Sequence, residues 1–139
     1  MQQNQVSASV SGQLHMEITA LEQLAEVTAL LESELQQWQV HEDKQMDLKL
    51  CVMEAVQNAL VHGGTAQEAP IAQIAWHCKA NEFCFTVTDN GAGVPEEIRT
   101  GEYKETLKES GRGLLLMRVI LDEVQFNETG NAVTGILRW

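Results

Sequence analysis

Residues 71–93 read IAQIAWHCKANEFCFTVTDNGAG, and this stretch decides the fold. Apolar and polar side chains alternate in residues 71–79 and again in residues 82–88, which is the pattern of half-buried strands. Asn81 stands between the two runs, so we expect a hairpin with a tight turn. The DNGAG segment at the end breaks the alternation and predicts a loop after the second strand.

Two helices are expected before this hairpin. Residues 43–62 are rich in Leu, Met, Ala and Val around most of a helical circumference, and Gly63-Gly64 follows them, so we expect a largely buried helix. Apolar residues recur at intervals of three and four in residues 19–38, with Thr19 as the expected cap. A weak strand is expected at residues 14–18.

The segment after the hairpin predicts a long loop over residues 94–110 and a helix over residues 113–121. Strands are expected at residues 123–127 and 132–139, on either side of a turn at residues 129–131. This order predicts an α+β fold, a two-layer sandwich with helices on one face of a largely antiparallel mixed sheet. We expect a single domain over residues 13–139. Residues 1–12 predict a flexible amino terminus, with an edge strand as the alternative.

Composition excludes several functional classes. The 139 residues carry a formal net charge of −11, which argues against a protein held to DNA or RNA by phosphate neutralisation. No stretch approaches 18 consecutive apolar residues, and residues 1–12 lack the pattern of a secretory signal, so we expect no membrane partner. The three cysteines lack metal-ligand spacing and lie in apolar runs. They predict reduced core residues in a cytoplasmic protein.

The charge is unevenly distributed along the chain. Residues 1–43 contain seven acidic residues and no Lys or Arg, whereas residues 94–118 contain five acidic and five basic residues. An acidic bias of this kind is typical of a solvated helix face, and it is also compatible with a basic protein partner.

Three places along the chain carry candidate chemistry. Six of the ten glycines lie in pairs at residues 63–64, 91–93 and 111–113, where they form either turns or ligand cradles. Glu54 and Asn58 lie one helical turn apart, followed by His62. This helix edge is either simply solvated, or a place where carboxylate and amide oxygens hold Mg²⁺ beside a nucleotide's phosphates.

Taken in order, these segments carry a resemblance. EAVQNALVHGG (54–64), DNGAG (89–93) and SGRGLLLM (110–117) resemble the N, G1 and G2 boxes of the histidine-kinase-like ATPase superfamily. The resemblance extends from about residue 14 to the end, and the form of the first box is most similar to that of the anti-sigma-factor serine/threonine kinases. It implies the sandwich described above, with ATP and Mg²⁺ as cofactors and a lid over residues 94–110.

The resemblance also implies roles for single residues in the first two boxes. Glu54 would be the general base that takes a proton from a substrate hydroxyl. Asn58 would bind the magnesium ion. Asp89 would accept a hydrogen bond from the adenine amino group, and Gly91 and Gly93 would let the backbone close on the base.

In the third box, Gly111 and Gly113 would shape a loop whose amides, at the start of the last helix beside Leu114, face the phosphates. Arg112, Lys104 or Lys108 would supply positive charge to the phosphates. His62 either lines the ribose and phosphate region or only caps its helix.

The function implied is an ATP-dependent serine/threonine protein kinase that is also an anti-sigma factor. It would phosphorylate an anti-sigma-factor antagonist and sequester a sigma factor in a partner-switching circuit, as a homodimer without direct contact to nucleic acid. The alternative is a nucleotide-sensing ATP-binding module that transfers no phosphate. A structural dimer with vestigial motifs would require all three boxes to be coincidence or decay.

Overall fold

The computed structural model describes residues 6–10, 12–93 and 109–139, with the side chains of residues 12–93 and 113–139. The strands are β1 (Val6–Val10), β2 (Gln13–Ile18), β3 (Ala72–Lys79), β4 (Glu82–Asp89), β5 (Glu123–Phe126) and β6 (Ala132–Arg138). The helices are the short 3-10 helix η1 (Leu21–Gln23), α1 (Leu24–Gln37), α2 (Glu42–His62) and α4 (Glu109–Ile120).

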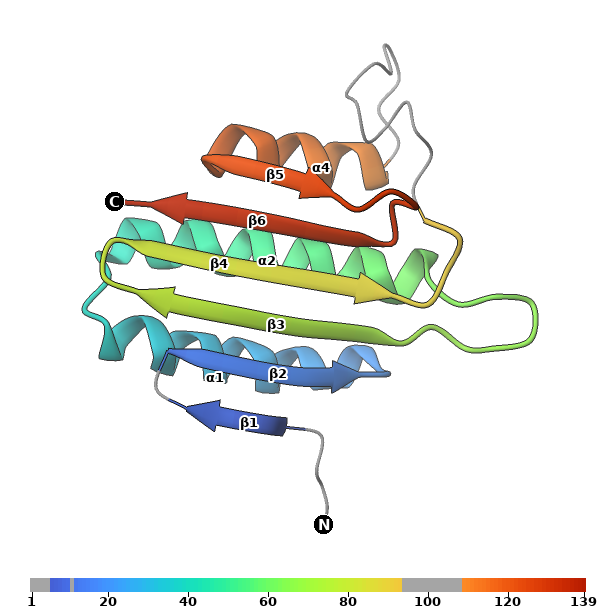
Figure 1. Ribbon diagram of the computed structural model, residues 1–139, viewed down its shortest axis with the longest axis horizontal. Coiled ribbons are helices and arrows are strands. Elements are labelled where there is room, and N and C mark those ends of the chain that lie inside the picture. The colour runs from blue at the N-terminus through green and yellow to red at the C-terminus, as the bar shows by residue number, and fades with distance from the viewer. Residues whose placement is uncertain (1–5, 11, 94–108) are drawn as a thin grey trace.

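The strands form one six-stranded sheet in the order β1-β2-β3-β4-β6-β5. Figure 1 shows α1, α2 and α4 together on one side of this sheet. The two-layer α+β sandwich predicted from the sequence is therefore confirmed. Each pair of neighbouring strands in the described part of the chain is antiparallel. The sheet formed by these strands is therefore antiparallel and not mixed.

The β3–β4 hairpin forms the middle of the sheet. Ile74 is paired with Val87 and Trp76 with Phe85, and all four side chains are buried against the helices. Asn81 adopts a positive φ of 71° in the two-residue turn, a conformation that asparagine tolerates better than most residues. The hairpin and its turn agree with the prediction to within one residue.

Strand β1 lies within the segment for which the sequence predicts a flexible amino terminus. It pairs with β2 at one edge of the sheet, with a shift in register between Val6 and Ala8. In residues 6–10, then, the structure has the edge strand that was the alternative interpretation.

The start of the first helical segment differs from the prediction. Thr19 is not the cap; instead Gln23 Oε1 accepts hydrogen bonds from the backbone N–H groups of Thr19, at 2.7 Å, and of Ala20, at 3.0 Å. The long Gln23 side chain reaches back over the first turn and satisfies donors that have no intrahelical partner.

Glu34 on α1 ties this helix to the sheet. Its Oε2 accepts hydrogen bonds from Trp38 Nε1 at 2.8 Å and from Gly12 N at 3.1 Å, and its Oε1 accepts one from Trp76 Nε1 at 3.4 Å. The apolar stripe of α1, which includes Val27, Leu31 and Leu35, is buried in the core.

Helix α2 packs one face on the sheet and is less buried than its composition predicts. Its buried face comprises Leu48, Cys51, Val52, Ala55, Val56 and Ala59. Met46 and Val61 are each 64% exposed, and Leu50 is 46% exposed. Within the described ranges, no helix combines the length and the apolar character needed to cross a membrane.

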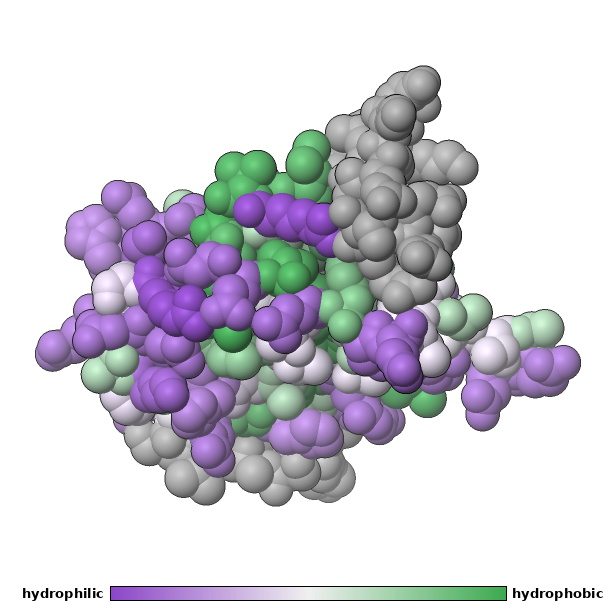
Figure 2. Space-filling model, turned by 45° about the horizontal axis from the view of Figure 1, so that its top comes forward, coloured by the Kyte–Doolittle hydropathy of each residue, from purple (hydrophilic) through white to green (hydrophobic). Residues whose placement is uncertain are grey.

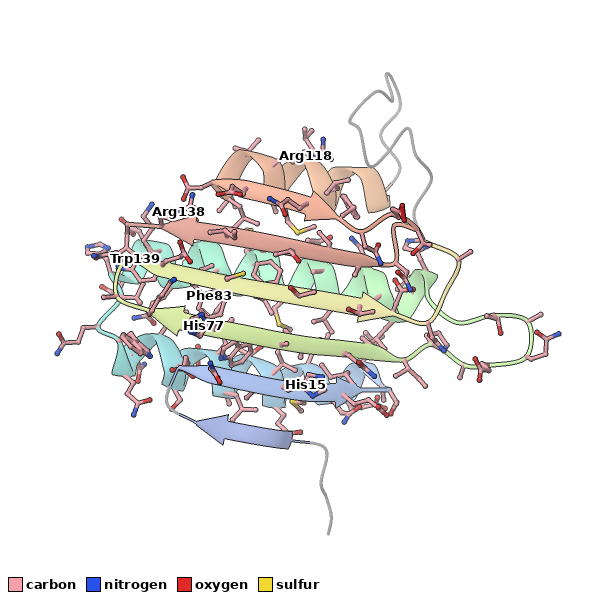
Figure 3. All side chains as sticks on the ribbon, viewed as in Figure 1. His15, His77, Phe83, Arg118, Arg138 and Trp139 are labelled. Carbon is pink, nitrogen blue, oxygen red and sulfur yellow. The ribbon has the colours of Figure 1, made fainter. Side chains whose placement is uncertain are left out.

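The cysteines occupy two kinds of environment. Cys51 and Cys78 are buried, and burial raises the pKa of each thiol to about 12. Cys84, predicted as a core residue, is only half-buried, because it lies on the face of β4 opposite to the buried Phe83 and Phe85. Figure 3 shows His15 and His77 on β2 and β3, and both alternate with buried residues on the opposite face. The sheet thus has one face covered by helices and one open face.

Candidate functional site

The candidate site lies at the C-terminal half of α2. There α2 faces the end of β4, the first turns of α4 and the turn that joins β5 to β6. A pocket and an adjoining groove meet along α2, and Asn58 and His62 line both of them. The free volume is about 60 Å³ in the pocket and about 500 Å³ in the groove. The site therefore consists of a narrow, mostly apolar pocket beside a wider groove.

The pocket has mostly apolar walls and one carboxylate in its lining. Ala59, Val87, Leu114, Met117 and Phe126 form much of its lining. Because β4 ends at Asp89, this carboxylate also lines the pocket. A mostly apolar cavity with a few placed polar groups is the usual form of a small-molecule site.

Asp89 is held firmly by its neighbours. Its Oδ1 accepts a hydrogen bond from Gly91 N at 2.7 Å, and its backbone N–H donates to Asn131 O at 2.8 Å. Asn131 Nδ2 in turn donates to Asp89 O at 3.1 Å. Burial raises the pKa of the Asp89 carboxyl, and the Gly91 hydrogen bond and the nearby His62 partly oppose this rise. Within the described part of the chain, Oδ2 has no hydrogen-bond partner and is available to a ligand.

The two glycines of the DNGAG segment allow close backbone contacts. A β-carbon on Gly91 would lie 2.9 Å from Gly63 Cα, at the end of α2. Gly93 has φ of +95°, and a β-carbon there would overlap the carbonyl oxygen of Thr129 in the β5–β6 turn. These glycines therefore hold the segment against α2 and against the last turn.

Glu54, Asn58 and His62 lie on one edge of α2, as their spacing predicts. Glu54 lines the groove together with Gln57, Val61 and Leu116. The structure thus places the Glu54 carboxylate outside the narrow pocket, one helical turn from the Asn58 amide that faces both spaces.

The residues of the third box lie within a helix. Because α4 begins at Glu109, Gly111 and Gly113 are in its first turns and not in a loop that precedes it. Helix formation here overrides the low helix propensity of glycine, because α4 packs on α2. Leu114 lines the pocket and Gly113 lines the groove. The side chain of Arg112 and the whole of Lys104 and Lys108 lie outside the described residues.

Several site residues have no clear sequence signal. Met117, Phe126 and Asn131 line the pocket, but in the sequence they read as core and turn residues. Asn90 Oδ1 accepts hydrogen bonds from Gly64 N and Ile71 N, both at 2.9 Å, which fixes the segment after α2. An asparagine next to an aspartate and a glycine signals a turn, and nothing local indicates that it binds a segment about 20 residues away.

Comparison with known proteins identifies the family. The family described as the histidine kinase-like ATPase domain matches residues 19–137. The chain belongs to this histidine kinase-like ATPase family. An anti-sigma F factor of Clostridium perfringens is 35% identical over 95 residues, which cover 66% of this chain and 68% of the relative. An anti-sigma F factor of Clostridium kluyveri is 31% identical over 101 residues, covering 68% and 69%.

Solved structures show the same fold. The catalytic domain of the histidine kinase ThkA aligns with a TM-score of 0.53 at 20% identity, covering 88% of this chain and 92% of that one. The histidine kinase domain from the Erythrobacter litoralis EL346 blue-light activated kinase aligns with a TM-score of 0.52 at 17% identity, covering 83% and 58%. This histidine kinase-like ATPase domain therefore has the ATP-binding fold of its family, as its three boxes predict.

Proposed function

We propose that this protein is an ATP-dependent serine/threonine kinase whose substrate is an anti-sigma-factor antagonist. One observation carries the proposal: the Glu54 carboxylate and the Asn58 amide lie on consecutive turns of α2, where a mostly apolar pocket lined by Asp89 adjoins an open groove. The similarity to anti-sigma F factors supports the choice of substrate and of a sigma factor as a second partner.

The pocket suits an adenine base. Its walls are apolar, and Asp89 provides an acceptor for the exocyclic amino group, while Gly91 N fixes the orientation of the carboxylate. A cavity of about 150 Å³ holds a benzene ring, so the free volume of about 60 Å³ requires the pocket to widen for a purine. Phe126 and the β5–β6 turn, at the edge of the sheet, are the walls that we expect to move.

The phosphates would extend from the pocket toward the start of α4. The first four backbone N–H groups of a helix lack intrahelical partners, and here they belong to residues 109–112. Asn58 would hold magnesium with its side-chain oxygen. In the described part of the chain no three His, Cys, Asp or Glu side chains converge as metal ligands, so the phosphates would complete the coordination. Bound there, the ion would neutralise negative charge on the phosphates.

Glu54 would act on the protein substrate. The groove that it lines is open to solvent, so a seryl or threonyl hydroxyl can approach the carboxylate. The hydroxyl proton passes to Glu54 while the hydroxyl oxygen bonds to the γ-phosphorus. The bond from that phosphorus to the β–γ bridging oxygen breaks, and ADP leaves with this oxygen.

The experiment that tests this function mixes the protein with γ-labelled ATP, Mg²⁺ and candidate antagonist proteins. We expect the label on a serine or threonine of the antagonist. ATP binding without transfer to any antagonist would favour the nucleotide-sensing module instead, and failure to bind ATP would contradict both.

We also propose that the protein is a homodimer that sequesters a sigma factor. Figure 2 shows apolar side chains gathered over α4, where Leu115 is 43% exposed and Val119 is 76% exposed. Such exposed apolar groups are typical of surfaces that bind other proteins. Analytical ultracentrifugation, alone and with the sigma factor, measures both associations, and a monomer at micromolar concentration would contradict the dimer.

A further inference from the structure

Gly113 is the point at which α4 contacts the side chain of Glu54. A β-carbon on Gly113 would overlap Glu54 Oε2, and it would lie 2.9 Å from Glu54 Cδ and 3.2 Å from Cγ. Each of these separations is shorter than ordinary van der Waals contact. Because both residues line the groove, α4 approaches the carboxylate as closely as a bare backbone allows.

Among the described side chains, packing is the contact that positions the Glu54 carboxylate. Among residues 12–93 and 113–139, no group donates a hydrogen bond to Glu54 or forms an ion pair with it. Asp89, by contrast, is fixed by the Gly91 N–H, and Glu34 by three donors. In the described part of the chain, the helical backbone of α2 and the surface of α4 at Gly113 therefore position this carboxylate.

Glycine is a poor choice for this helical position on local grounds. It has the lowest helix propensity of any residue except proline, and Gly113 lies within α4. Sequences commonly depart from a local preference of this kind at functional sites.

We propose that Gly113 is a positioning residue for Glu54. This inference rests on the proposed function, in which Glu54 is the general base. Because Gly113 has no side chain, the Glu54 carboxylate has room to lie against α4 and face the groove. A methyl group at residue 113 displaces the carboxylate, and the fold tolerates the displacement because the atoms that move are the far end of a flexible side chain.

The test compares Gly113→Ala, Glu54→Ala and the double variant with the wild type. We expect Gly113→Ala to lower kcat for phosphoryl transfer about 100-fold, within the range of a lost general base, while the Kd for ATP and the KM for the antagonist change less than about twofold. In the Glu54→Ala background, Gly113→Ala should lower kcat no further. Ser33→Ala, on the exposed face of α1, is the control for helix propensity and should leave transfer unchanged.

Melting temperature gives a second measurement that does not depend on kinase activity. Alanine favours the helix, and the overlap with Glu54 opposes this gain, so Gly113→Ala should raise the melting temperature more in the Glu54→Ala background than in the wild type. Equal increments in the two backgrounds, undiminished transfer by Gly113→Ala, or a further loss in the double variant would overturn the inference. If the wild type transfers no phosphate, the proposed function fails. The difference between the two increases in melting temperature then decides by itself whether Gly113 positions Glu54.

Discussion

At the scale of single residues, the two carboxylates of the site lie in different surroundings. Asp89 is partly desolvated, with one oxygen bound to a backbone N–H, whereas Glu54 lines an open groove and has no hydrogen-bond partner among the described residues. A fixed, partly buried carboxylate suits recognition of a ligand. A carboxylate on an open groove suits proton transfer with an arriving substrate.

The raised pKa of Asp89 predicts how stability depends on pH. Burial makes the charged form of the carboxyl less favourable in the folded state. The resulting loss of stability is absent when the pH lies below the ordinary pKa of 3.8, and it is fully present once the pH has risen through the raised pKa of the folded state. Asp89→Asn is neutral and retains an oxygen for Gly91 N. We expect it to melt above the wild type at pH 7, with the difference shrinking as pH falls toward 4. A difference that is constant with pH would contradict this assignment.

The same substitution should weaken nucleotide binding. We propose that Asp89 accepts a hydrogen bond from the adenine amino group. In Asp89→Asn the side-chain oxygen stays bound to Gly91 N, so the amide NH₂ faces the adenine amino group and two donors meet. A hydrogen bond to a charged group contributes about 1.5–3 kcal/mol, so we expect ATP affinity to fall about 10- to 100-fold. Isothermal titration calorimetry measures the Kd, and unchanged affinity would mean that the base binds elsewhere.

At the scale of elements, the β5–β6 turn closes the pocket because Gly93 packs against it. Gly93→Ala should destabilise the fold by about 2 kcal/mol or more, because a positive φ costs an L-residue about 1–2 kcal/mol and the new methyl group meets backbone at Thr129. Urea unfolding measures the loss, with Ala92→Gly at the exposed neighbouring position as the control. A loss for Gly93→Ala no larger than that of the control would contradict the packing.

The rim of the groove should select the protein substrate. Leu21 on η1 is 54% exposed and Val61 on α2 is 64% exposed, and both line the groove beside Glu54. Leu21→Ser with Val61→Ser should raise the KM for the antagonist about tenfold, equivalent to about 1.4 kcal/mol, without changing the Kd for ATP. Met46→Ser, equally exposed at the other end of α2, is the matched control. Equal effects of the two changes would show that the groove does not bind the substrate.

Elements with strong local signals could be predicted from the sequence, and their ends could not. The alternation and Asn81 were sufficient to predict the β3–β4 hairpin. Thr19 is a better cap than glutamine by intrinsic preference, yet Gln23 provides the cap because its side chain reaches back to the N–H groups before it. The last helix was predicted to begin at Gly113, and packing of α4 on α2 extends it back through Gly111 to Glu109.

The candidate site was predictable only in part, for a physical reason. Glu54, Asn58 and His62 share one helix, so their spacing alone places them on one edge. Phe126 and Asn131 join them because β6 pairs with β4 and β5 pairs with β6, and no local pattern records these pairings. The roles that the resemblance implies for the individual site residues remain predictions.

At the scale of the whole molecule, the acidic amino-terminal region divides into structural and exposed charges. Glu32 pairs with Lys49 at 2.7 Å, and Glu34 binds two indole groups. The exposed acidic residues of this region are Glu22, Glu26, Glu42 and Asp43. The surface available to a basic partner is therefore smaller than the charge of residues 1–43 suggests.

This distribution predicts a salt-dependent association with the sigma factor. Exposed charges are screened beyond about 8 Å at 0.15 M salt, so affinity should fall as salt increases from 0.05 to about 0.5 M. Neutralising Glu22 and Glu26 to glutamine should reduce that dependence, whereas Glu32→Gln, which removes a partly buried pair, should act mainly on stability. An affinity that is independent of salt would leave the acidic bias as a feature of solubility.

The central claim is that Glu54 is the general base of a protein kinase, and single-turnover transfer from γ-labelled ATP to the antagonist tests it most directly. We predict that Glu54→Ala binds ATP with wild-type affinity and transfers phosphate about 10²- to 10⁴-fold more slowly. Transfer by Glu54→Ala at the wild-type rate, with the antagonist labelled on the same hydroxyl, would contradict the account.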